Sequence, residues 1–444
     1  MKKLLLATAL CSLFVSQIKA NEESVTIDKG VIEPVYIAIC PFFGEESKND
    51  VISMIVKSDL SSTGLFLPIK ENAFLQNISS YNVDVAYQNW NAIHARYLVF
   101  GDVQYVENNK VKVRFKLYDI LLQRKEVEYV LEGNIRSLRK MAHLVSNEIY
   151  KRITGSEGYF DTKVAYVSVT RQRNGKKINR LAIMDHDGAA HKFLTDGSNI
   201  VLTPRFSPDK DELIFFAYGE KVVRGRRKTL VGNLYKYSFD TNTITAVFKD
   251  SPYMNYAPRY SPDGKKLLYS MSNDSGYSSL YVMDLATKSV KRLTRGACID
   301  TSPCYSPDMK KIVFNSDRGG SQQIYMMNVD GSDIHRVSFG KGRYATPVWS
   351  PDGKWIAFTR MWGRKFYIGI MKPDGSKERL LACGHLVESP AWAPNSRVLM
   401  FAHQDRSGTE RMHSIDITGY NQREIPTPMD GITPEWAHPM NFVN

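Results

Sequence analysis

One motif that recurs through the C-terminal part of the chain constrains the fold more than any other feature. A complete copy reads Ala257-Pro258-Arg259-Tyr260-Ser261-Pro262-Asp263-Gly264. The six copies begin at Thr203, Ala257, Ser302, Thr346, Ser389 and Thr433. After a longer first interval they lie roughly 44 residues apart, within the period range of β-propeller blades. The repeat therefore predicts a propeller.

Each repeat carries the signals of four short strands. The first strand bears an aromatic residue, and Ser-Pro-Asp-Gly then suits a tight turn, because Pro fixes φ and Asp and Gly favour turn positions. An alternating or apolar strand follows, such as Lys266 to Ser270, and then a strand rich in Tyr or Met, such as Leu280 to Asp284. A hairpin turn like that at Asp330-Gly331 leads to a last strand, as at Ile334 to Val337. Four strands per unit describe one propeller blade.

The two ends of the repeat region complement each other. The sixth copy, at Thr433, supplies one strand only. The segment before the first copy supplies three, at Val164 to Val169, Arg180 to Asp185 and His191 to Thr195. Joining them completes a sixth blade and closes the ring, which removes the exposed sheet edges that invite aggregation. We therefore expect an all-β six-bladed β-propeller.

The residues before the propeller do not share the repeat and predict a small N-terminal α/β domain, so the fold class is α+β and multi-domain. Strands are expected at Val35 to Cys40, Tyr97 to Val106, Lys110 to Tyr118 and Lys125 to Val130, with Asn108-Asn109 as a turn. Helical spacing covers Asp50 to Leu60, Val83 to Ala95 and Leu138 to Ile153, the last ending at Gly155. We place the N-terminal domain at residues 21–157 and the propeller at 158–444.

The first twenty residues resemble a secretory signal peptide. Lys2 and Lys3 precede an apolar stretch from Leu4 to Val15, and Ala20 offers a small residue for cleavage. A lipid anchor at Cys11 is the alternative, but a bulky leucine precedes that cysteine where a lipoprotein signal requires a small residue. No later stretch approaches the roughly 18 unbroken apolar residues of a membrane span. We expect residues 1–20 to be removed and the mature protein to be exported without an anchor.

The chain is basic, with a formal net charge of +13 that falls to +10 when three lysines leave with the signal peptide. Inside a cell this balance would suggest nucleic acid, but for an exported protein it favours acidic proteins, anionic lipid or cell-wall polymers. The densest basic run lies in a predicted hairpin loop: Lys221, Arg224, Arg226, Arg227 and Lys228. It is interpreted as a solvated loop, with a contact site as the alternative.

Motifs for catalysis, cofactors or metals are missing from the sequence. There is no G-x-S-x-G elbow, H-E-x-x-H, P-loop or zinc spacing, so we expect no catalytic residue, cofactor or metal. Asp185-His186-Asp187-Gly188 could be a calcium loop, but related hairpins at Asp330-Gly331 and Asp374-Gly375 favour a turn. Cys298 and Cys304 are close enough in sequence to pair, but small buried side chains without a disulfide are the favoured interpretation, since no CxxC or metal-like spacing occurs.

The combination of leader, small α/β domain and six-copy propeller resembles the TolB family, the periplasmic component of the Tol-Pal system of Gram-negative bacteria. The resemblance covers essentially the whole mature chain. Its more specific signals are Val25-Thr26-Ile27-Asp28-Lys29-Gly30, the strand Tyr97-Leu98-Val99-Phe100-Gly101, and Ile153-Thr154-Gly155 before Val164-Ala165-Tyr166-Val167. It implies a periplasmic scaffold that is not an enzyme and that supports outer-membrane integrity and envelope constriction during division.

The resemblance implies two binding surfaces. The N-terminal segment of such proteins contacts TolA, and packing of the segment on its own domain is the alternative. The matching residues are Val25, Thr26, Ile27, Asp28, Lys29 and Gly30. The propeller mouth of such proteins receives the peptidoglycan-associated lipoprotein Pal. The matching positions here are Val201, Leu202, Asn255, Tyr256, Asp300, Thr301, Ala345, Thr346, Glu388 and Ser389. Other outer-membrane lipoproteins or porins are further candidate partners, whereas nucleic acid is not expected.

Two other classes of function stay open from the residues. The first is an enzyme, such as a glycan lyase or esterase, which would need carboxylates or histidines converging in the propeller mouth. The second is a module that binds polysaccharide or cell wall, for which aromatic residues and the positive charge are mild support. The two-domain layout and the N-terminal strand favour the scaffold over both.

Overall fold

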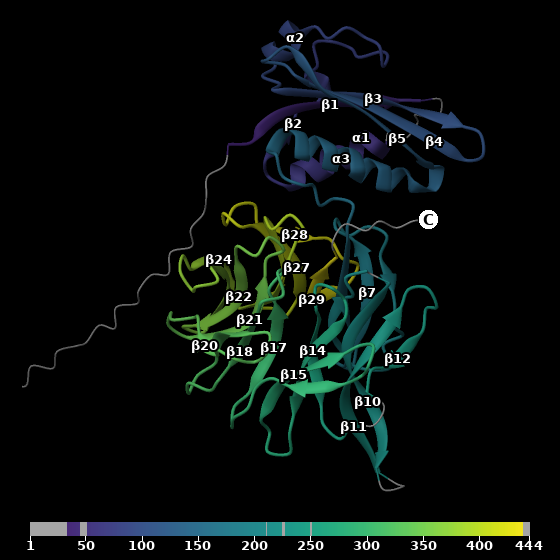
Figure 1. Ribbon diagram of the computed structural model, residues 1–444. Coiled ribbons are helices and arrows are strands. Elements are labelled where there is room, and N and C mark those ends of the chain that lie inside the picture. Colours follow the sequence, from purple (N-terminus) through teal and green to yellow (C-terminus); the bar gives the residue numbers. More distant parts are fainter. Residues whose placement is uncertain (1–32, 45–50, 210, 224–226, 249–250, 438–444) are drawn as a thin grey trace, which may run out of the picture.

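The chain folds into a small helix-and-sheet part and a ring of sheets beside it (Figure 1). The structure is a computed structural model and describes residues 33–44, 51–209, 211–223, 227–248 and 251–437. The segment Val25-Thr26-Ile27-Asp28-Lys29-Gly30 and the leader lie outside the described residues. Within the described part, no helix is both long enough and apolar enough to cross a bilayer.

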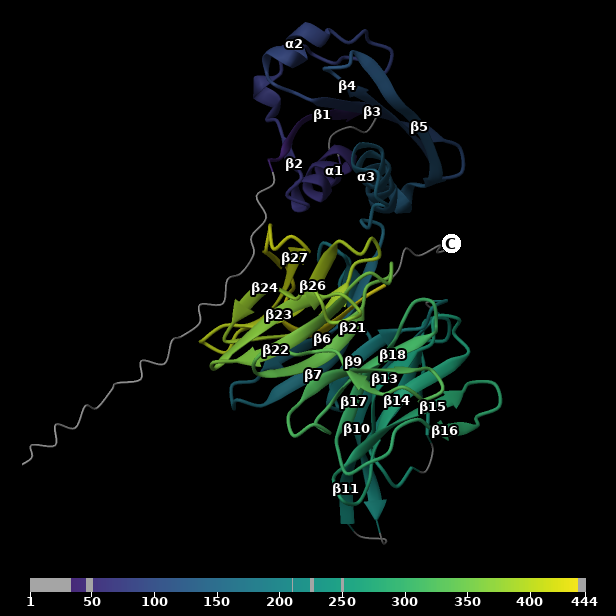
Figure 2. The ribbon, with the colours of Figure 1, turned by 60° about the vertical axis from the view of Figure 1, so that its left-hand side comes forward.

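The N-terminal part is one mixed sheet with the strand order β2-β1-β3-β4-β5. Its strands are β1 (Val35–Phe43), β2 (Phe66–Pro68), β3 (Tyr97–Val106), β4 (Lys110–Asp119) and β5 (Arg124–Asn134). Its helices are α1 (Val51–Ser62), α2 (Tyr87–Ala92) and α3 (Leu138–Thr154), with short 3-10 turns η1 (Glu71–Ala73) and η2 (Ile135–Ser137). Figures 1 and 2 both place α1 and α3 between this sheet and the propeller.

Apolar faces explain why these elements pack as they do. Helix α3 buries Met141, Val145 and Ile149 with the inner face of the sheet, as the predicted helical spacing requires. It ends at Gly155, whose φ of 72° is the left-handed conformation of a helix C-cap. The turn at Asn108-Asn109 is confirmed, with φ of 63° and 59°, which suits a two-residue hairpin.

The helix predicted at Val83 to Ala95 is much shorter in the structure. Only Tyr87–Ala92 is helical, because Gln76 binds the preceding backbone in an extended form. The Gln76 amide donates to the Asp84 carbonyl at 2.7 Å and accepts from the Ala86 amide at 2.9 Å. These bonds hold residues 84–86 out of the helix, although Trp90 is fully buried as its spacing suggested.

The propeller consists of six sheets of four strands each, which confirms the predicted number of blades. The first five blades run in sequence order. Their strands are β9 (Val201–Phe206), β10 (Glu212–Val223), β11 (Arg227–Ser238), β12 (Ile244–Ala246); β13 (Asn255–Tyr260), β14 (Lys266–Ser272), β15 (Ser278–Asp284), β16 (Val290–Arg292); β17 (Asp300–Tyr305), β18 (Lys311–Ser316), β19 (Gln323–Asn328), β20 (His335–Arg336); β21 (Arg343–Trp349), β22 (Ile356–Trp362), β23 (Lys365–Met371), β24 (Arg379–Gly384); β25 (Leu386–Trp392), β26 (Val398–Gln404), β27 (Glu410–Asp416) and β28 (Arg423–Ile425).

The sixth blade joins the two ends of the repeat region, as the truncated last copy predicted. Its sheet has the order β29-β6-β7-β8. The strands are β29 (Asp430–Trp436), β6 (Lys163–Arg171), β7 (Lys177–Asp185) and β8 (Lys192–Phe193). Strand β29 is antiparallel to β6, with Trp436 opposite Val164 and Asp430 opposite Val169. This pairing closes the ring non-covalently.

Two smaller predictions can be compared with the structure. The basic run lies at the tip of the hairpin β10–β11, where Val223 pairs with Arg227, and residues 224–226 lie outside the described part. Cys40, Cys298 and Cys304 are buried, and among the described residues Cys298 and Cys304 form no disulfide with each other. The interpretation of these cysteines as small buried side chains is therefore confirmed.

Candidate functional site

The channel through the propeller is lined by the first strand of every blade, and these strands share a backbone distortion. The third or fourth residue of each copy of the strand has a positive φ, between 48° and 57°, and a proline follows it. These residues are Thr203, Ala257, Ser302, Thr346, Ser389 and Thr433. At each one the pairing register with the second strand shifts, as in a β-bulge. The proline needs no ladder hydrogen bond at such a point, which explains why the motif carries one.

Five of the six distorted residues form the waist of the channel. Thr203, Ala257, Ser302, Thr346 and Ser389, with the prolines that follow the last four of them, line a cavity of only about 50 Å³. A wider opening of about 440 Å³ lies on the turn side of it. The sequence analysis missed this shared backbone distortion, although its signal is visible as a Ser, Thr or Ala before proline in all six copies.

Strand direction fixes which loops meet at each end of the channel. Strands within a blade are antiparallel, so the turns after the first and third strands share one end of the ring. We name that end the turn mouth, because the Ser-Pro-Asp-Gly turns lie there. The loop mouth is the opposite end, where the loops before β9, β13, β17, β21 and β25 enter the ring. All ten predicted Pal-binding positions lie on the loop-mouth side of the waist or at it.

The N-terminal part rests on the turn side of the propeller. The Asn421 side-chain amide, in the turn between β27 and β28, donates to the Ser62 carbonyl at 2.7 Å. Arg139 of α3 pairs with Asp185 and Asp187 in the turn between β7 and β8. The loop mouth therefore faces away from the N-terminal part, and the hairpin β10–β11 points away from it in both views (Figure 2).

The predicted residues of the loop mouth divide into buried and half-buried groups. Val201, Asn255 and Asp300 are buried, whereas Leu202, Tyr256, Thr301, Ala345, Thr346, Glu388 and Ser389 are half-buried. Val201 packs in the apolar layer between the sixth and first blades. Asp300 accepts from one guanidinium nitrogen of Arg318 at 3.0 and 2.8 Å. Their side chains thus support the mouth rather than line its surface.

Blades two and three carry the polar centre of the loop mouth. Burial raises the pKa of the Tyr256 phenol, which hydrogen-bonds Ser278 and Thr301 across the two blades. Beneath it, buried side-chain atoms of Asn255, Ser270 and Asn315 have no hydrogen-bond partner among the described residues. Ser270 lies opposite Tyr256 and Asn315 opposite Thr301 in the sheets. Arg318, Ser270 and Asn315 are site residues that the sequence analysis missed, since they belong to second strands and the turns after them.

Glu388 brings an unpaired carboxylate to the fifth blade. Burial, and then the negative charge of Glu410, raise the pKa of Glu388. Glu410 itself is paired with Lys177 at 3.1 Å. By contrast, the hydroxyl groups of Thr346 and Thr359 hydrogen-bond to each other at 2.9 Å. The mouth is therefore polar on several sides, and its Glu388 carboxylate has no cationic partner among the described residues.

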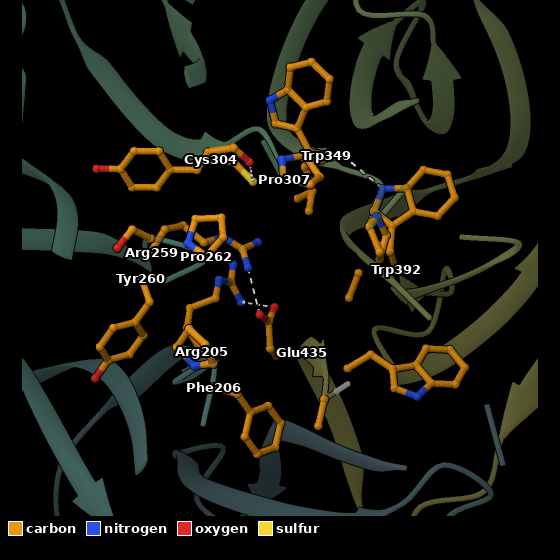
Figure 3. A pocket seen from close by; sticks show the side chains of 18 of the residues that line it. Arg205, Phe206, Arg259, Tyr260, Pro262, Cys304, Pro307, Trp349, Trp392 and Glu435 are labelled. Atoms are coloured by element: carbon orange, nitrogen blue, oxygen red, sulfur yellow. Dashed lines mark hydrogen bonds and ion pairs between the residues drawn. The ribbon is translucent and has the colours of Figure 1, made fainter. Parts of the chain in front are cut away.

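The turn mouth opens into a cavity of about 440 Å³, where three charged side chains lie together with aromatic residues around them (Figure 3). The Glu435 carboxylate lies between two guanidinium groups, 3.2 Å from Arg205 and 2.8 Å from Arg259. Burial, and then the neighbouring Arg259, lower the pKa of Arg205 to about 10. All three occupy the same position of their repeat copies, on adjacent blades.

Two of the three tryptophans around this cavity join neighbouring elements, whereas the buried indole nitrogen of Trp349 has no hydrogen-bond partner among the described residues. The Trp392 indole donates to the Val348 carbonyl at 3.0 Å, and the Trp436 indole donates to the Thr162 hydroxyl at 2.8 Å. Each bond links one blade to the next or to the segment that enters the ring. These indoles therefore serve packing, which weakens the interpretation of the aromatic residues as a glycan platform.

The chemistry of the channel suits binding. It offers rigid backbone, hydroxyl and amide groups at the loop mouth and a compensated charge cluster at the turn mouth. A hydrolytic or lyase mechanism needs a base within hydrogen-bond reach of a nucleophile or metal. Glu388 is the unpaired acid of the loop mouth, and no described histidine contacts it.

The chain matches two family models. The TolB amino-terminal domain matches residues 23–126, and the TolB beta propeller domain matches residues 150–439. The Tol-Pal system protein TolB of Rickettsia rickettsii, in the strains Sheila Smith and Iowa, is 41% identical over 449 residues, covering 97% of this chain and 98% of the relative. The crystal structure of TolB from Acinetobacter baumannii superposes with a TM-score of 0.80 at 28% identity, covering 93% of this chain and 99% of that one.

Proposed function

This chain belongs to the TolB family of Tol-Pal system proteins, and from that premise we propose that it is a periplasmic scaffold that binds Pal at the loop mouth. We propose that TolA binds its N-terminal segment, so that the chain links the inner-membrane Tol complex to the outer membrane. This link would support outer-membrane integrity and constriction during division. The role is one of binding, without a catalytic step.

The observation that carries the Pal proposal is the set of unsatisfied polar atoms under the loop mouth. The side-chain oxygen of Asn255, the hydroxyl of Ser270 and the side-chain amide of Asn315 are buried and lack hydrogen-bond partners among the described residues. An unpaired buried polar group costs about 1–3 kcal/mol. A partner segment that supplied hydrogen bonds there, directly or through water, would recover part of that cost.

The rigidity of the loop mouth also favours binding. Every inner strand is fixed by a left-handed residue and a proline, and the ring is closed by β29 and β6. A partner would therefore meet a surface that is already ordered, and little conformational entropy would be lost on the scaffold side. We propose direct contacts for Tyr256, Thr301 and Thr346, and supporting roles for Val201, Asn255 and Asp300.

The N-terminal segment is suited to strand pairing. Val25 to Gly30 alternates apolar and polar residues at the start of the proposed mature chain. A short free strand of this kind can add to the edge of another sheet, where main-chain hydrogen bonds give affinity. We propose cleavage near Ala20, a domain boundary at residues 157–158 and a periplasmic location for the mature chain.

Calorimetric titration with the soluble domain of Pal from the same organism tests the Pal site. The chain from Asn21 onward keeps every described residue. Saturable binding is expected, and Thr301→Ala should weaken it about tenfold, or about 1.4 kcal/mol. Asn255→Ala should have a similar or smaller effect. Thr241→Ala and Thr243→Ala, at exposed positions between β11 and β12 on the turn side of the ring, are controls that should leave the affinity unchanged.

Two results would contradict the Pal proposal. Binding that is equally strong in Thr301→Ala, Asn255→Ala and both controls would move the contact away from blades two and three. A lack of heat at high micromolar concentration, at two temperatures, would remove Pal as the partner, and cell-wall glycan would then be tested.

The TolA proposal needs a separate titration. Deleting Glu22 to Gly30 should abolish binding of the soluble TolA domain, while the affinity for Pal shows whether segment and mouth communicate. Retained TolA binding in the deletion variant would place the TolA contact elsewhere on the chain.

A further inference from the structure

Three titratable side chains meet in the junction between the N-terminal part and the propeller. Asp59 comes from α1, His143 from α3 and His186 from the turn after β7. Their exposed fractions are 1%, 3% and 1%. None of them contributes to the loop mouth, because this junction lies on the turn side of the ring.

The contacts among the three leave most of their polar atoms without partners. The His143 Nδ1 lies 2.7 Å from Asp59 Oδ2, which is one hydrogen bond. The His186 Nε2 lies 3.5 Å from Asp59 Oδ1, which is a loose contact. Asp59 Oδ1, His143 Nε2 and both ring nitrogens of His186 have no hydrogen-bond partner among the described residues.

A fully buried imidazole with two unsatisfied nitrogens needs an explanation, because buried polar groups are normally paired. The aromatic neighbours of His186 offer no hydrogen-bond partner, since the rings of Tyr159 and Phe160 lie 6.0 and 5.6 Å from its ring. These aromatic walls also keep solvent away.

The charge and protonation state of the cluster suit a cation. Burial lowers the pKa of His186 to about 4, so the imidazole is neutral at neutral pH and has a lone pair to offer. The carboxylates of Asp59 and Asp187 favour positive charge at His186, whereas His143 and then Arg423 oppose it. Asp185 and Asp187 are themselves paired with Arg139, and Asp185 also with Lys163.

We propose that Asp59, His143 and His186 bind a divalent transition-metal ion, with Zn²⁺ as the ion that best matches two imidazoles and a carboxylate. Each residue offers one ligand atom within 4.8 Å of the others. The 3.5 Å between Asp59 Oδ1 and His186 Nε2 is near the roughly 3.3 Å that separates two ligand atoms on a tetrahedral zinc with bonds of about 2.0 Å. For His143 to become the third ligand, its ring would have to exchange the 2.7 Å hydrogen bond to Asp59 for a bond to the metal.

The proposed ion would act as a clamp between the two parts of the chain. Two ligands come from helices of the N-terminal part and one from a propeller turn. The ion binds only when the parts are docked, so metal binding and docking stabilise each other. The segments of the chain that supply the ligands are thereby held in one arrangement.

Metal titration of the tag-free chain from Asn21 onward tests the proposal. After chelator dialysis, one equivalent of Zn²⁺ should bind in calorimetry and raise the unfolding temperature by about 3 °C. Co²⁺ should give the visible absorption bands of a four-coordinate site. His186→Gln should lower the affinity at least tenfold, whereas His335→Gln, an exposed histidine on a propeller hairpin, should leave it unchanged.

The outcome for the unaltered chain decides the matter even where a variant fails to fold. A wild-type chain that binds neither ion, or binds Co²⁺ without those bands, overturns the proposal. Equal affinity in wild type, His186→Gln and Asp59→Asn also overturns it, because the metal would then lie elsewhere. Loss of binding in both variants with retained far-ultraviolet circular dichroism supports it.

Discussion

The propeller channel and the junction with the N-terminal part both bury charged groups, yet they compensate them differently. In the channel, Glu435 is held between Arg205 and Arg259 at 3.2 and 2.8 Å. In the junction, the Asp59 side chain has one close contact, with His143. Both ring nitrogens of His186 lack hydrogen-bond partners among the described residues. The charges of the first site are compensated within the chain, whereas the second leaves polar atoms without hydrogen-bond partners among the described residues.

The origin of the residues explains this difference. The channel charges occupy one repeat position on adjacent blades, so the symmetry of the ring brings them together. The junction cluster draws on segments that share no repeat and are far apart along the chain, Asp59 and His143 being 84 residues apart. Inside the ring, the repeat places opposite charges next to one another. At the junction, whether a charged group meets a partner depends on how two separate folds dock.

The largest effect is expected from removing the central carboxylate of the channel. Glu435→Ala leaves two nearly buried guanidinium groups facing each other without a counter-charge. Breaking a buried ion pair in this way costs about 3–5 kcal/mol. Urea unfolding of the chain should therefore show a clearly lower midpoint.

Two further variants serve as comparisons for Glu435→Ala. Glu435→Gln keeps an acceptor oxygen and should lose less stability than the alanine variant. Glu71→Ala breaks an exposed pair with Lys57 and should change stability by less than about 1 kcal/mol. An unfolding midpoint for Glu435→Ala equal to that of Glu71→Ala would show that the channel charges are solvated after all.

A smaller effect is expected where the two parts touch. Gly64 has a φ of 70°, and a Cβ there would lie 2.8 Å from the Tyr420 ring and 2.9 Å from Asn421. Gly64→Ala should therefore combine left-handed backbone strain with crowding of the junction, at a cost of about 2 kcal/mol. Limited proteolysis at the junction and urea unfolding would both register the change.

The matched control isolates the crowding. Gly276 has a φ of 78°, and nothing lies within 4 Å of its added Cβ. Gly276→Ala should cost only the backbone strain, about 1 kcal/mol. Equal losses in the two variants would mean that the junction relaxes freely, against the picture of a tightly docked interface.

The fold was predictable because the propeller repeats its signals. Turns at Ser-Pro-Asp-Gly, alternating strands and the truncated copy at Thr433 gave the six blades and the pairing of β29 with β6. The helix at Val83 to Ala95 was predicted wrongly in its bounds, because side-chain bonds from the distant Gln76 hold the backbone extended. Local spacing cannot reveal such a competitor.

The candidate sites were less predictable for the same physical reason. The loop-mouth positions followed from the family resemblance, but Arg318, Ser270 and Asn315 belong to neighbouring strands and emerged only with the register. The sequence was expected to hold no metal site, since it lacks local ligand spacing. The proposed ligands Asp59, His143 and His186 come from three separate segments, so only the docked fold brings them together.

The smallest predicted effect concerns Glu388, a channel carboxylate that, unlike Glu435, has no cationic partner among the described residues. Burial and Glu410 raise its pKa in the folded chain above the ordinary value of about 4.3. The folded state then binds its proton more tightly than the unfolded state, so this residue costs stability as the pH rises through the folded pKa, and the cost stays above it. Glu388→Gln removes that cost and should stabilise the chain at pH 7 by less than about 1 kcal/mol.

Urea unfolding at several pH values between 4 and 8 checks this prediction. The gain from Glu388→Gln should vanish at the acid end, where both states are protonated, and grow toward neutral pH. Glu71→Gln, at an exposed position, should show no such trend. A Glu388→Gln chain that is less stable than wild type at pH 7 would mean that the carboxylate has a stabilising partner. The channel would then contain no uncompensated acid, and the contrast with the junction would be stronger.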